Sequence, residues 1–244
     1  MDIRVLENYD ALSAAAAAHI ESLLGGKDRA LICLAAGDSP KGVYASIARA
    51  LLEGRLESTR LSVVQLDEWE GLSAEDDGSC AGFIRDAFVR PSGLGEERVR
   101  YFDAKHAEAG CLAIEAFLAA EGPIWLSVLG IGPNGHLGLN EPGSAFDSPC
   151  RVVHIADSTA RTGQKYFAAG RKLERGVTIG LAALRASRHV VLIASGPTKA
   201  QAVGRLFSGK PDTDSPLSSM LDHPSCVLYL DREAAVLLPA GKWS

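Results

Sequence analysis

A glycine-rich segment, residues 130–143, contains a histidine and a glutamate five positions apart. Its five glycines favour neither a helix nor a strand, and they allow the backbone to approach a ligand closely. His136 and Glu141 together are typical of acid/base catalysis, because a carboxylate fixes the tautomer and orientation of an imidazole. The segment therefore predicts an acid/base site, with a structural histidine in a turn as the alternative.

A pair of adjacent carboxylates, Asp67 and Glu68, follows the hydrophobic run 61–66. We expect residues 67–71 to form a loop at the end of a buried strand. Successive side chains of an extended chain point in opposite directions, so only one carboxylate should enter a site. Partial burial would raise its pKa and make it a general base. A solvated acidic loop is the alternative.

A third segment, residues 35–40, reads Ala-Ala-Gly-Asp-Ser-Pro and joins a hydrophobic run to a helix-length segment. Gly37 permits a tight turn, and Ser39 followed by Pro40 predicts a helix start with the serine as cap. Free N–H groups at such a start favour a phosphate. An ordinary capped turn would have the same sequence.

The elements that must position these segments alternate along the chain. Strand-length hydrophobic runs occur at residues 30–35, 61–66, 124–129, 152–155, 177–179, 190–194 and 226–230. Helix-length segments between them are 10–24, 41–52, 80–90, 107–120 and 198–207. Such alternation predicts an α/β fold, with one doubly wound, Rossmann-like domain over residues 1–244 and a mostly parallel sheet. Ligands of these sheets bind at the carboxyl ends of the strands, which is where the three segments fall.

The composition restricts the partners. The formal net charge of −5 argues against a nucleic acid or an anionic membrane, since both require a basic surface. Five cysteines without a CxxC pair, and no His/Cys/Asp/Glu grouping with metal-ligand spacing, predict neither disulfides nor a metal, and no cofactor is expected. The N-terminus shows no signal-peptide pattern and the alanine run 14–18 is too short to span a membrane, so a cytoplasmic protein is expected.

In this order the three segments resemble the glucosamine-6-phosphate deaminase / 6-phosphogluconolactonase superfamily, over about residues 31–230. Gly-His followed by Asn-Glu-Pro at 140–142 is similar to the deaminase branch. The lactonase branch has Asp-Gly-His and then Ala-Ser-Leu-Phe-Pro. Asp-Glu-Trp at 67–69 likewise resembles the deaminases, because the lactonases have Asp-Glu-Arg. Gly-Ser-Cys at 78–80, where most glucosamine-type members have Glu-Ser-Tyr, and Arg-Gly-Val-Thr at 175–178 are most similar to galactosamine-6-phosphate isomerases.

The resemblance implies a NagB/RpiA-like fold and an enzyme that converts an amino-sugar 6-phosphate and water into a ketose 6-phosphate and ammonia. Galactosamine 6-phosphate would give tagatose 6-phosphate, and glucosamine 6-phosphate would give fructose 6-phosphate; the sequence leaves the choice open. A sugar-phosphate lactone hydrolase and a non-catalytic sugar-phosphate sensor are the alternatives. The chain ends at Ser244 without the C-terminal extension of hexameric members, so a monomer or homodimer is expected.

The resemblance also implies roles for individual residues. Asp67 matches the base that moves a proton between C2 and C1, and His136 matches the group that opens the sugar ring. Glu141 matches the carboxylate that orients the histidine. Asn134 stands where some members have Asp, so the histidine should depend more on Glu141.

Other matching residues would bind the substrate phosphate. Ser39 and the amides of Gly37 and Asp38 match the phosphate loop, and Lys199 matches the phosphate lysine of the family. Ala36 replaces a threonine that many members have. The second phosphate cation is Lys165 by one alignment and Arg161 by another.

Overall fold

The computed structural model describes residues 1–207 and 210–239. The expectation of a monomer or homodimer was based on the end of the chain at residues 243–244, which lie outside the described residues. A parallel seven-stranded sheet has the order β1-β10-β9-β6-β2-β3-β5. Its strands are β1 (Asp2–Leu6), β2 (Ala30–Leu34), β3 (Leu61–Gln65), β5 (Val99–Arg100), β6 (Leu126–Gly130), β9 (His189–Ala194) and β10 (Cys226–Asp231). The predicted α/β fold with a mostly parallel sheet is confirmed.

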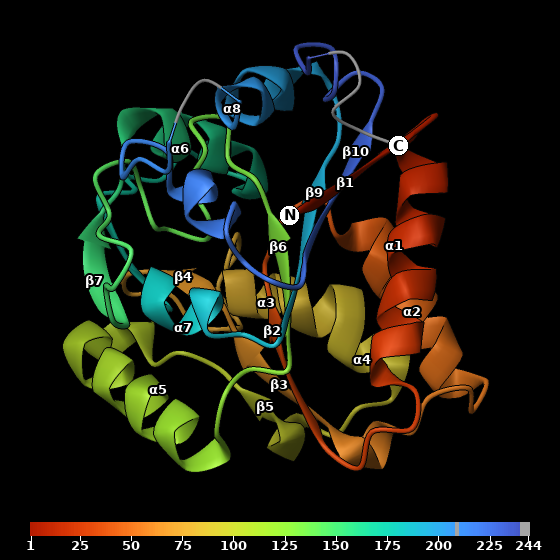
Figure 1. Cartoon of the computed structure of the whole chain (residues 1–244). Helices are drawn as coiled ribbons and strands as arrows, with labels where there is room; N and C mark the ends of the chain where they lie inside the picture. The colour runs from red at the N-terminus through yellow and green to blue at the C-terminus, as the bar shows by residue number, and fades with distance from the viewer. Residues whose placement is uncertain (208–209, 240–244) are drawn as a thin grey trace.

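Helices cover both faces of this sheet (Figure 1). On one face lie α1 (Tyr9–Leu24) and α2 (Lys41–Leu52); on the other lie α5 (Ala107–Glu121), α7 (Leu181–Arg185) and α8 (Ala200–Arg205). Strand β2 shows why both faces need cover: Ile32 and Leu34 pack in the core of α1 and α2, whereas Leu31 and Cys33 pack in the other core. This two-sided burial explains the unbroken hydrophobic runs of the sequence.

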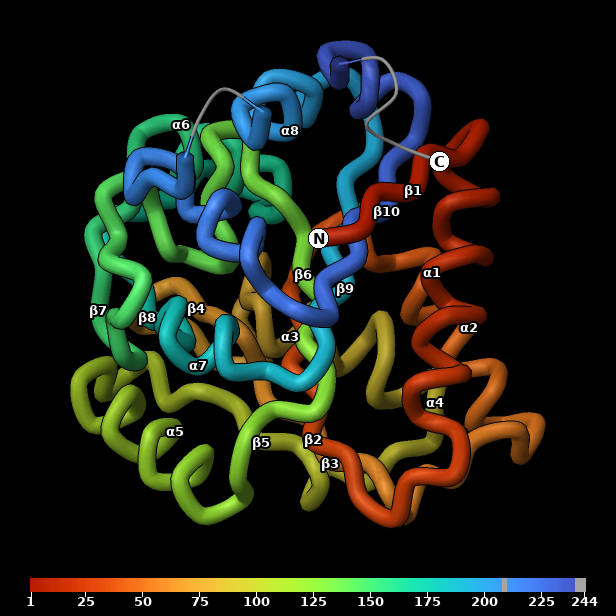
Figure 2. Tube along the Cα trace, viewed as in Figure 1, coloured from red at the N-terminus to blue at the C-terminus, as the bar shows by residue number. Residues whose placement is uncertain are grey.

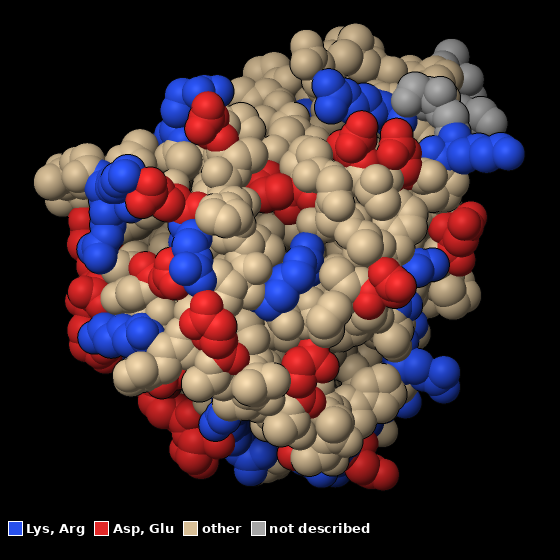
Figure 3. Space-filling view, turned by 90° about the vertical axis from the view of Figure 1, so that its left-hand side faces the viewer, with Lys and Arg blue, Asp and Glu red and all other residues tan. Residues whose placement is uncertain are grey.

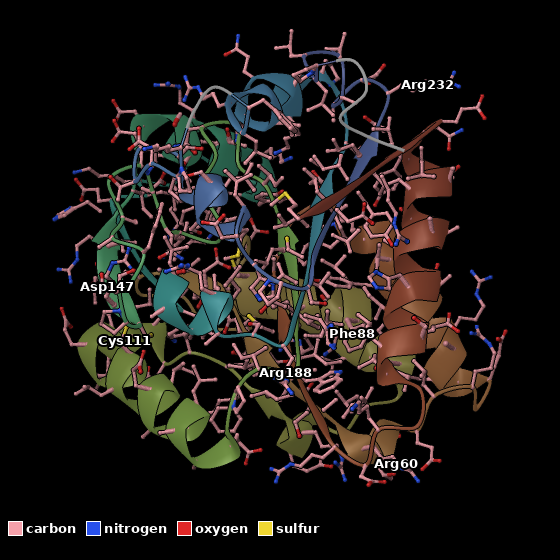
Figure 4. The ribbon with its side chains drawn as sticks, viewed as in Figure 1. Arg60, Phe88, Cys111, Asp147, Arg188 and Arg232 are labelled. Carbon is pink, nitrogen blue, oxygen red and sulfur yellow. The ribbon has the colours of Figure 1, made fainter. Side chains whose placement is uncertain are left out.

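The strand order reverses between β2 and β6. From β2 the chain adds β3 and β5 on one side, and from β6 it adds β9 and β10 on the other. Arg60 and Arg188, which precede β3 and β9, appear at one end of the sheet in Figure 4, and Arg232, which follows β10, appears at the other. The loops after β2 and β6 therefore separate at the carboxyl end of the sheet, where such folds bind ligands.

A second, antiparallel sheet corrects three predictions. It has the order β4-β8-β7, with β4 (Asp67–Trp69), β8 (Arg175–Thr178) and β7 (Arg151–His154). Residues 67–69 are thus a strand and not part of a loop, and the runs 152–155 and 177–179 do not join the parallel sheet. The cause is a long-range partner: the amide of Ile179 donates to the Leu66 carbonyl (2.8 Å) and draws the chain after β3 onto β8.

Several helical segments also differ from expectation. The predicted helix 80–90 is divided into α3 (Cys80–Ile84), a π-helical turn at Arg85–Val89 and α4 (Arg90–Ser92). The sequence did not predict α6 (Asp157–Gly163) or α7. The 3₁₀ turns are Ser58–Arg60, Glu96–Arg98, Ala104–His106, Gln164–Tyr166, Pro197–Lys199 and Pro216–Met220. Within the described residues, no helix has the length and hydrophobicity to cross a membrane.

Strand β1 was not predicted either, because its hydrophobic residues are few and alternate with polar ones. It pairs in parallel with β10, from Asp2 opposite Val227 to Leu6 opposite Asp231. Figure 2 shows the two strands side by side in the colours of opposite chain ends. The first strand of the chain therefore depends on the last one for its hydrogen bonds.

The surface carries both signs of charge. On the face shown in Figure 3, Lys and Arg side chains alternate with Asp and Glu. This face offers a polyanion no continuous basic surface, in line with the formal net charge of −5.

Candidate active site

A pocket of about 810 Å³ opens at the carboxyl ends of β2, β3, β6 and β9. This volume lies within the range of small-ligand sites. Its walls include parts of the three segments singled out in the sequence, at residues 35–40, 67–69 and 130–139, and the loop 195–199. Further wall residues come from 74–86 and 159–166. The fold thus brings the predicted acid/base and phosphate segments into one cavity.

Asp67 is the first residue of β4, two positions after the end of β3, and it lines the pocket. The residue is 8% exposed, and within the described chain its carboxyl group accepts no hydrogen bond. Burial, followed by the neighbouring charge of Glu68, raises the pKa of Asp67 to about 8. Glu68 does not line the pocket. The expectation that only one of the two carboxylates enters the site is confirmed.

His136 depends on a glycine. The amide of Gly132 donates to the His136 carbonyl (3.0 Å), and the amide of Gly135 donates to the Gly132 carbonyl (3.0 Å), so the segment forms a tight turn. A Cβ atom on Gly132 would lie 2.2 Å from Cε1 of the His136 ring. Only glycine at position 132 lets the imidazole occupy its place in the pocket wall.

Behind the imidazole lies a set of polar groups. Nδ1 of His136 is 3.0 Å from Oγ1 of Thr159 and 3.5 Å from Oε2 of Glu141. Burial works against ionisation of Glu141, but the hydrogen bond and charge of His136 outweigh it and lower the pKa of this carboxyl group. Nδ2 of Asn134 donates to Oε2 of Glu141 (2.8 Å), and the Ala156 amide donates to Oε1 (3.3 Å). Glu141 is thus fixed beside the ring as an anion.

The structure refines the roles of these partners. Asn134 contacts the glutamate and, through Oδ1, accepts a hydrogen bond from the His136 amide (3.1 Å), but it does not contact the ring nitrogens. Thr159 is the nearer ring partner and was not predicted. It lies on α6, and it is buried with an exposed fraction of 4%. Its sequence surroundings, Asp-Ser-Thr-Ala-Arg-Thr-Gly, contain no signal that would distinguish it from a surface residue.

The loop after β2 differs from the predicted capped turn. Pro40, and not Ser39, occupies the position before α2, and no side chain caps this helix. The Gly42 amide bonds instead to the hydroxyl of Tyr9 (2.8 Å). Gly37 adopts a φ of +133°, a conformation that side chains disfavour. Within the described chain the amides of Gly37 and Ser39 donate no hydrogen bond, so both remain available to a ligand.

Of two lysines in the pocket, one is paired with a carboxylate and the other is not. Nζ of Lys165 is 2.6 Å from Oδ2 of Asp38, whose Oδ1 is 2.8 Å from Nζ of Lys41. Lys199, which is half-buried, has no ion-pair partner within the described residues. Burial, followed by the charge of Lys165, lowers the pKa of Lys199 to about 8. An anion at this point would supply the missing counter-charge and raise that pKa again.

The structure separates the two alternatives for a second cation. Lys165 lines the pocket, and its stem lies near the ring of Tyr166, with Nζ 4.9 Å from the ring centroid. Arg161 is exposed and does not line the pocket. Tyr166 was not predicted; its hydroxyl lies 3.6 Å from where a Cβ on Gly37 would stand. Residues 1–207 and 210–239 contain no group of three or more His, Cys, Asp or Glu side chains placed to hold a metal ion.

A parallel sheet whose switch-point pocket combines an oriented histidine, a buried carboxylate and an uncompensated lysine defines an α/β enzyme. Residues 7–228 match the family described as glucosamine-6-phosphate isomerases/6-phosphogluconolactonase, and the chain belongs to this family.

The similarity to known proteins extends over nearly the whole chain. "Putative deaminase AgaI" of Escherichia coli (strain K12) is 34% identical over 232 residues, which are 94% of this chain and 91% of that protein. "Glucosamine-6-phosphate deaminase 1" of Bacillus subtilis (strain 168) is 32% identical over 244 residues, 98% of this chain and 100% of that protein. The solved structure of a monomeric glucosamine-6-phosphate deaminase of the NagB superfamily is 30% identical, with a TM-score of 0.92 over 97% of this chain and 100% of that chain.

Proposed function

We propose that this protein is an amino-sugar 6-phosphate deaminase, which produces a ketose 6-phosphate and ammonia. The observation that supports this most strongly is a single pocket that joins an unpartnered, basic carboxylate on Asp67 to an uncompensated lysine, Lys199. The first suits a general base and the second suits a phosphate. Relatives named glucosamine-6-phosphate deaminases support the same activity.

In this mechanism His136 opens the ring. It accepts the proton of O1 and returns it to the ring oxygen, which breaks the C1–O5 bond and gives the open-chain aldehyde. Glu141 favours the transient imidazolium because the carboxylate is held at 3.5 Å from Nδ1.

Asp67 then carries out the isomerisation. It removes the C2 proton, which the C1 carbonyl acidifies, and the resulting enolamine is reprotonated at C1 by the same carboxyl group. Water adds to the imine carbon at C2, and ammonia leaves to give the ketose. A base with a pKa near 8 holds a proton more readily than an ordinary carboxylate does, so it suits transfer from carbon.

Ammonia release tests the activity directly. A coupled assay with galactosamine 6-phosphate and glucosamine 6-phosphate should show turnover of at least one. Turnover of a 6-phosphogluconolactone without ammonia release would favour a lactonase, and binding of sugar phosphates without any turnover would favour a sensor.

Between the two epimers we place galactosamine 6-phosphate first. The supporting feature is the segment 78–80, which lines the pocket and, together with residues 66–69 and 175–178, resembles galactosamine-6-phosphate isomerases. A higher kcat/KM for glucosamine 6-phosphate in the same assay would reverse this order and leave the reaction class intact. We also propose a monomer or homodimer, supported by the monomeric state of the neighbouring solved structure.

Replacing Lys199 should weaken recognition of the phosphate. A hydrogen bond to a charged group contributes about 1.5–3 kcal/mol, which corresponds to roughly a 10- to 150-fold rise in KM for Lys199→Ala. An unphosphorylated amino sugar should lose little. Lys172, an exposed lysine paired with Glu174, provides the matched control Lys172→Ala. Equal losses with both substrates would contradict a phosphate role for Lys199.

Replacing Lys165 and Arg161 in parallel should identify the second phosphate cation. We expect Lys165→Ala to raise KM for the phosphorylated sugar, because Lys165 lines the pocket, and we expect Arg161→Ala to leave KM within about twofold, because Arg161 is exposed outside it. Steady-state kinetics of both variants suffice. The opposite ranking would assign the role to Arg161.

A further inference from the structure

We propose that Glu68 is a positioning residue that acts as a fixed negative charge and sets the basicity of Asp67. The proposal rests on the proposed function only in assigning Asp67 as the base. Glu68 is 1% exposed, lies beside Asp67 in β4 and does not line the pocket. It therefore takes no direct part in the chemistry described above.

The hydrogen bonds that Glu68 accepts favour its ionised form. Oε2 accepts hydrogen bonds from Nε2 of Gln65 (3.0 Å), Oγ of Ser79 (2.9 Å) and the Ala81 amide (2.8 Å). Oε1 accepts from the amides of Trp69 and Cys80, each at 2.9 Å. Five donors surround one carboxyl group, which is how proteins stabilise a buried carboxylate.

The orientations of the two side-chain partners are fixed as well. Oγ of Ser79 accepts from the Gly82 amide (3.1 Å) and therefore turns its proton to Glu68. Oε1 of Gln65 accepts from the Phe102 amide (2.9 Å), which leaves its NH₂ group for Glu68. Both side chains therefore act as donors to Glu68. Burial raises the pKa of Glu68 above its ordinary value, and the bonds from Ala81, Cys80, Trp69 and Ser79 reduce this rise without cancelling it.

Glu68 is also the charged group that acts on Asp67, from the next position along β4. The other titratable neighbours are Cys33 on β2, Tyr44 on α2 and Cys80 on α3. Burial raises the pKa of all three, so they are neutral at physiological pH. Strand β8 presents Thr178 opposite Asp67, and the imidazole of His136 lines the same pocket. Among the described residues, the negative charge of Glu68 is therefore what makes ionisation of Asp67 harder beyond burial itself.

Carboxyl-carbon NMR of the substrate-free protein tests this without relying on turnover. The protein is labelled with ¹³C at the side-chain carboxyl carbon of aspartate. The signal that disappears in Asp67→Asn is then assigned to Asp67. We expect the Asp67 midpoint near pH 8 to fall by on the order of one pH unit in Glu68→Gln. The acid limb of the profile of kcat/KM against pH should shift to lower pH by the same amount as the Asp67 midpoint. An unchanged midpoint in Glu68→Gln would overturn the proposal.

Ser79→Ala is the matched control. It removes one donor to Glu68 and the side-chain cap of α3, where Ser79 accepts from Gly82, and it should lower the stability of the protein. The charge of Glu68 remains, so the Asp67 midpoint should not move. A shift equal to that of Glu68→Gln would mean that Glu68 acts only by holding α3.

A measurement on the unaltered protein covers the case in which Glu68→Gln does not fold. With ¹³C-labelled glutamate, Glu68 should remain a carboxylate throughout the pH range in which Asp67 titrates. A Glu68 that is protonated in that range would overturn the proposal. Absence of deaminase activity would refute the proposed function but would leave these titrations interpretable.

Discussion

Asp67→Asn is expected to lower kcat by at least about 10²- to 10⁴-fold and at the same time to make the protein more stable at neutral pH. The amide has the shape of the carboxylic acid but cannot accept the C2 proton, so isomerisation stops. Binding of a sugar phosphate should be almost unchanged, because we propose Lys199 and Lys165, and not Asp67, as the phosphate contacts. Near-normal turnover by the variant would refute the role of Asp67 as the base.

The gain in stability follows from the pKa of Asp67, which rises from 3.8 to about 8 in the folded protein. Between these pH values the folded state holds a proton that the unfolded state has lost, so the stability of the native protein falls as the pH rises through this range. Each unit of pKa difference corresponds to about 1.4 kcal/mol. Asp67→Asn removes this dependence.

Thermal or denaturant unfolding at several pH values measures the effect. The variant should be more stable than the native protein at pH 8, and the difference should shrink toward pH 4. Asp147→Asn is the control, because Asp147 is exposed at the outer surface near β7 (Figure 4). A stability difference that does not vary with pH would contradict the raised pKa.

His136→Gln is expected to lose about 10²- to 10⁴-fold in kcat/KM with the cyclic amino-sugar phosphate, and to recover much of it with an open-chain analogue. An analogue without the hydroxyl groups that close the ring bypasses the step assigned to His136. It should not rescue Asp67→Asn. Equal recovery by both variants would mean that His136 has no special part in ring opening.

The partner of His136 allows a second measurement. Glu141→Gln should also lose activity and shift the pH–rate profile, because the anion that favours imidazolium is gone. The double variant of His136 and Glu141 should lose little more than His136→Gln alone, as expected of groups that act as one unit. Additive losses would show that the two residues work independently.

Much of this architecture is predictable because the strands of the main sheet are buried on both faces. Continuous hydrophobic runs identify β2, β3, β6, β9 and β10, and the site lies at the ends of the first four of them. β1 and β4 escape prediction because neither contains a continuous hydrophobic run, and each pairs with a distant partner, β10 or β8.

Prediction of the site is likewise limited by contacts between residues that are distant in the sequence. Asp67, His136 and Glu141 carry recognisable sequence contexts, and the structure places them together. Thr159 reaches His136 only because α6 packs against the glycine-rich segment, a contact across 23 positions. Lys165 and Arg161 are four residues apart, and the orientation of this one segment decides which of them faces the cavity.

The pairing of β1 with β10 has a consequence for synthesis of the chain. β1 leaves the ribosome before its partner, which follows about 220 residues later; at 5–20 residues per second this is a delay on the order of 10–45 s. Asp231, at the end of β10, accepts hydrogen bonds from Ser195 and from the Gly196 amide, and so anchors the loop that carries Lys199. A nascent chain therefore lacks both the pairing of β1 and the anchor of the loop that carries Lys199 until β10 emerges.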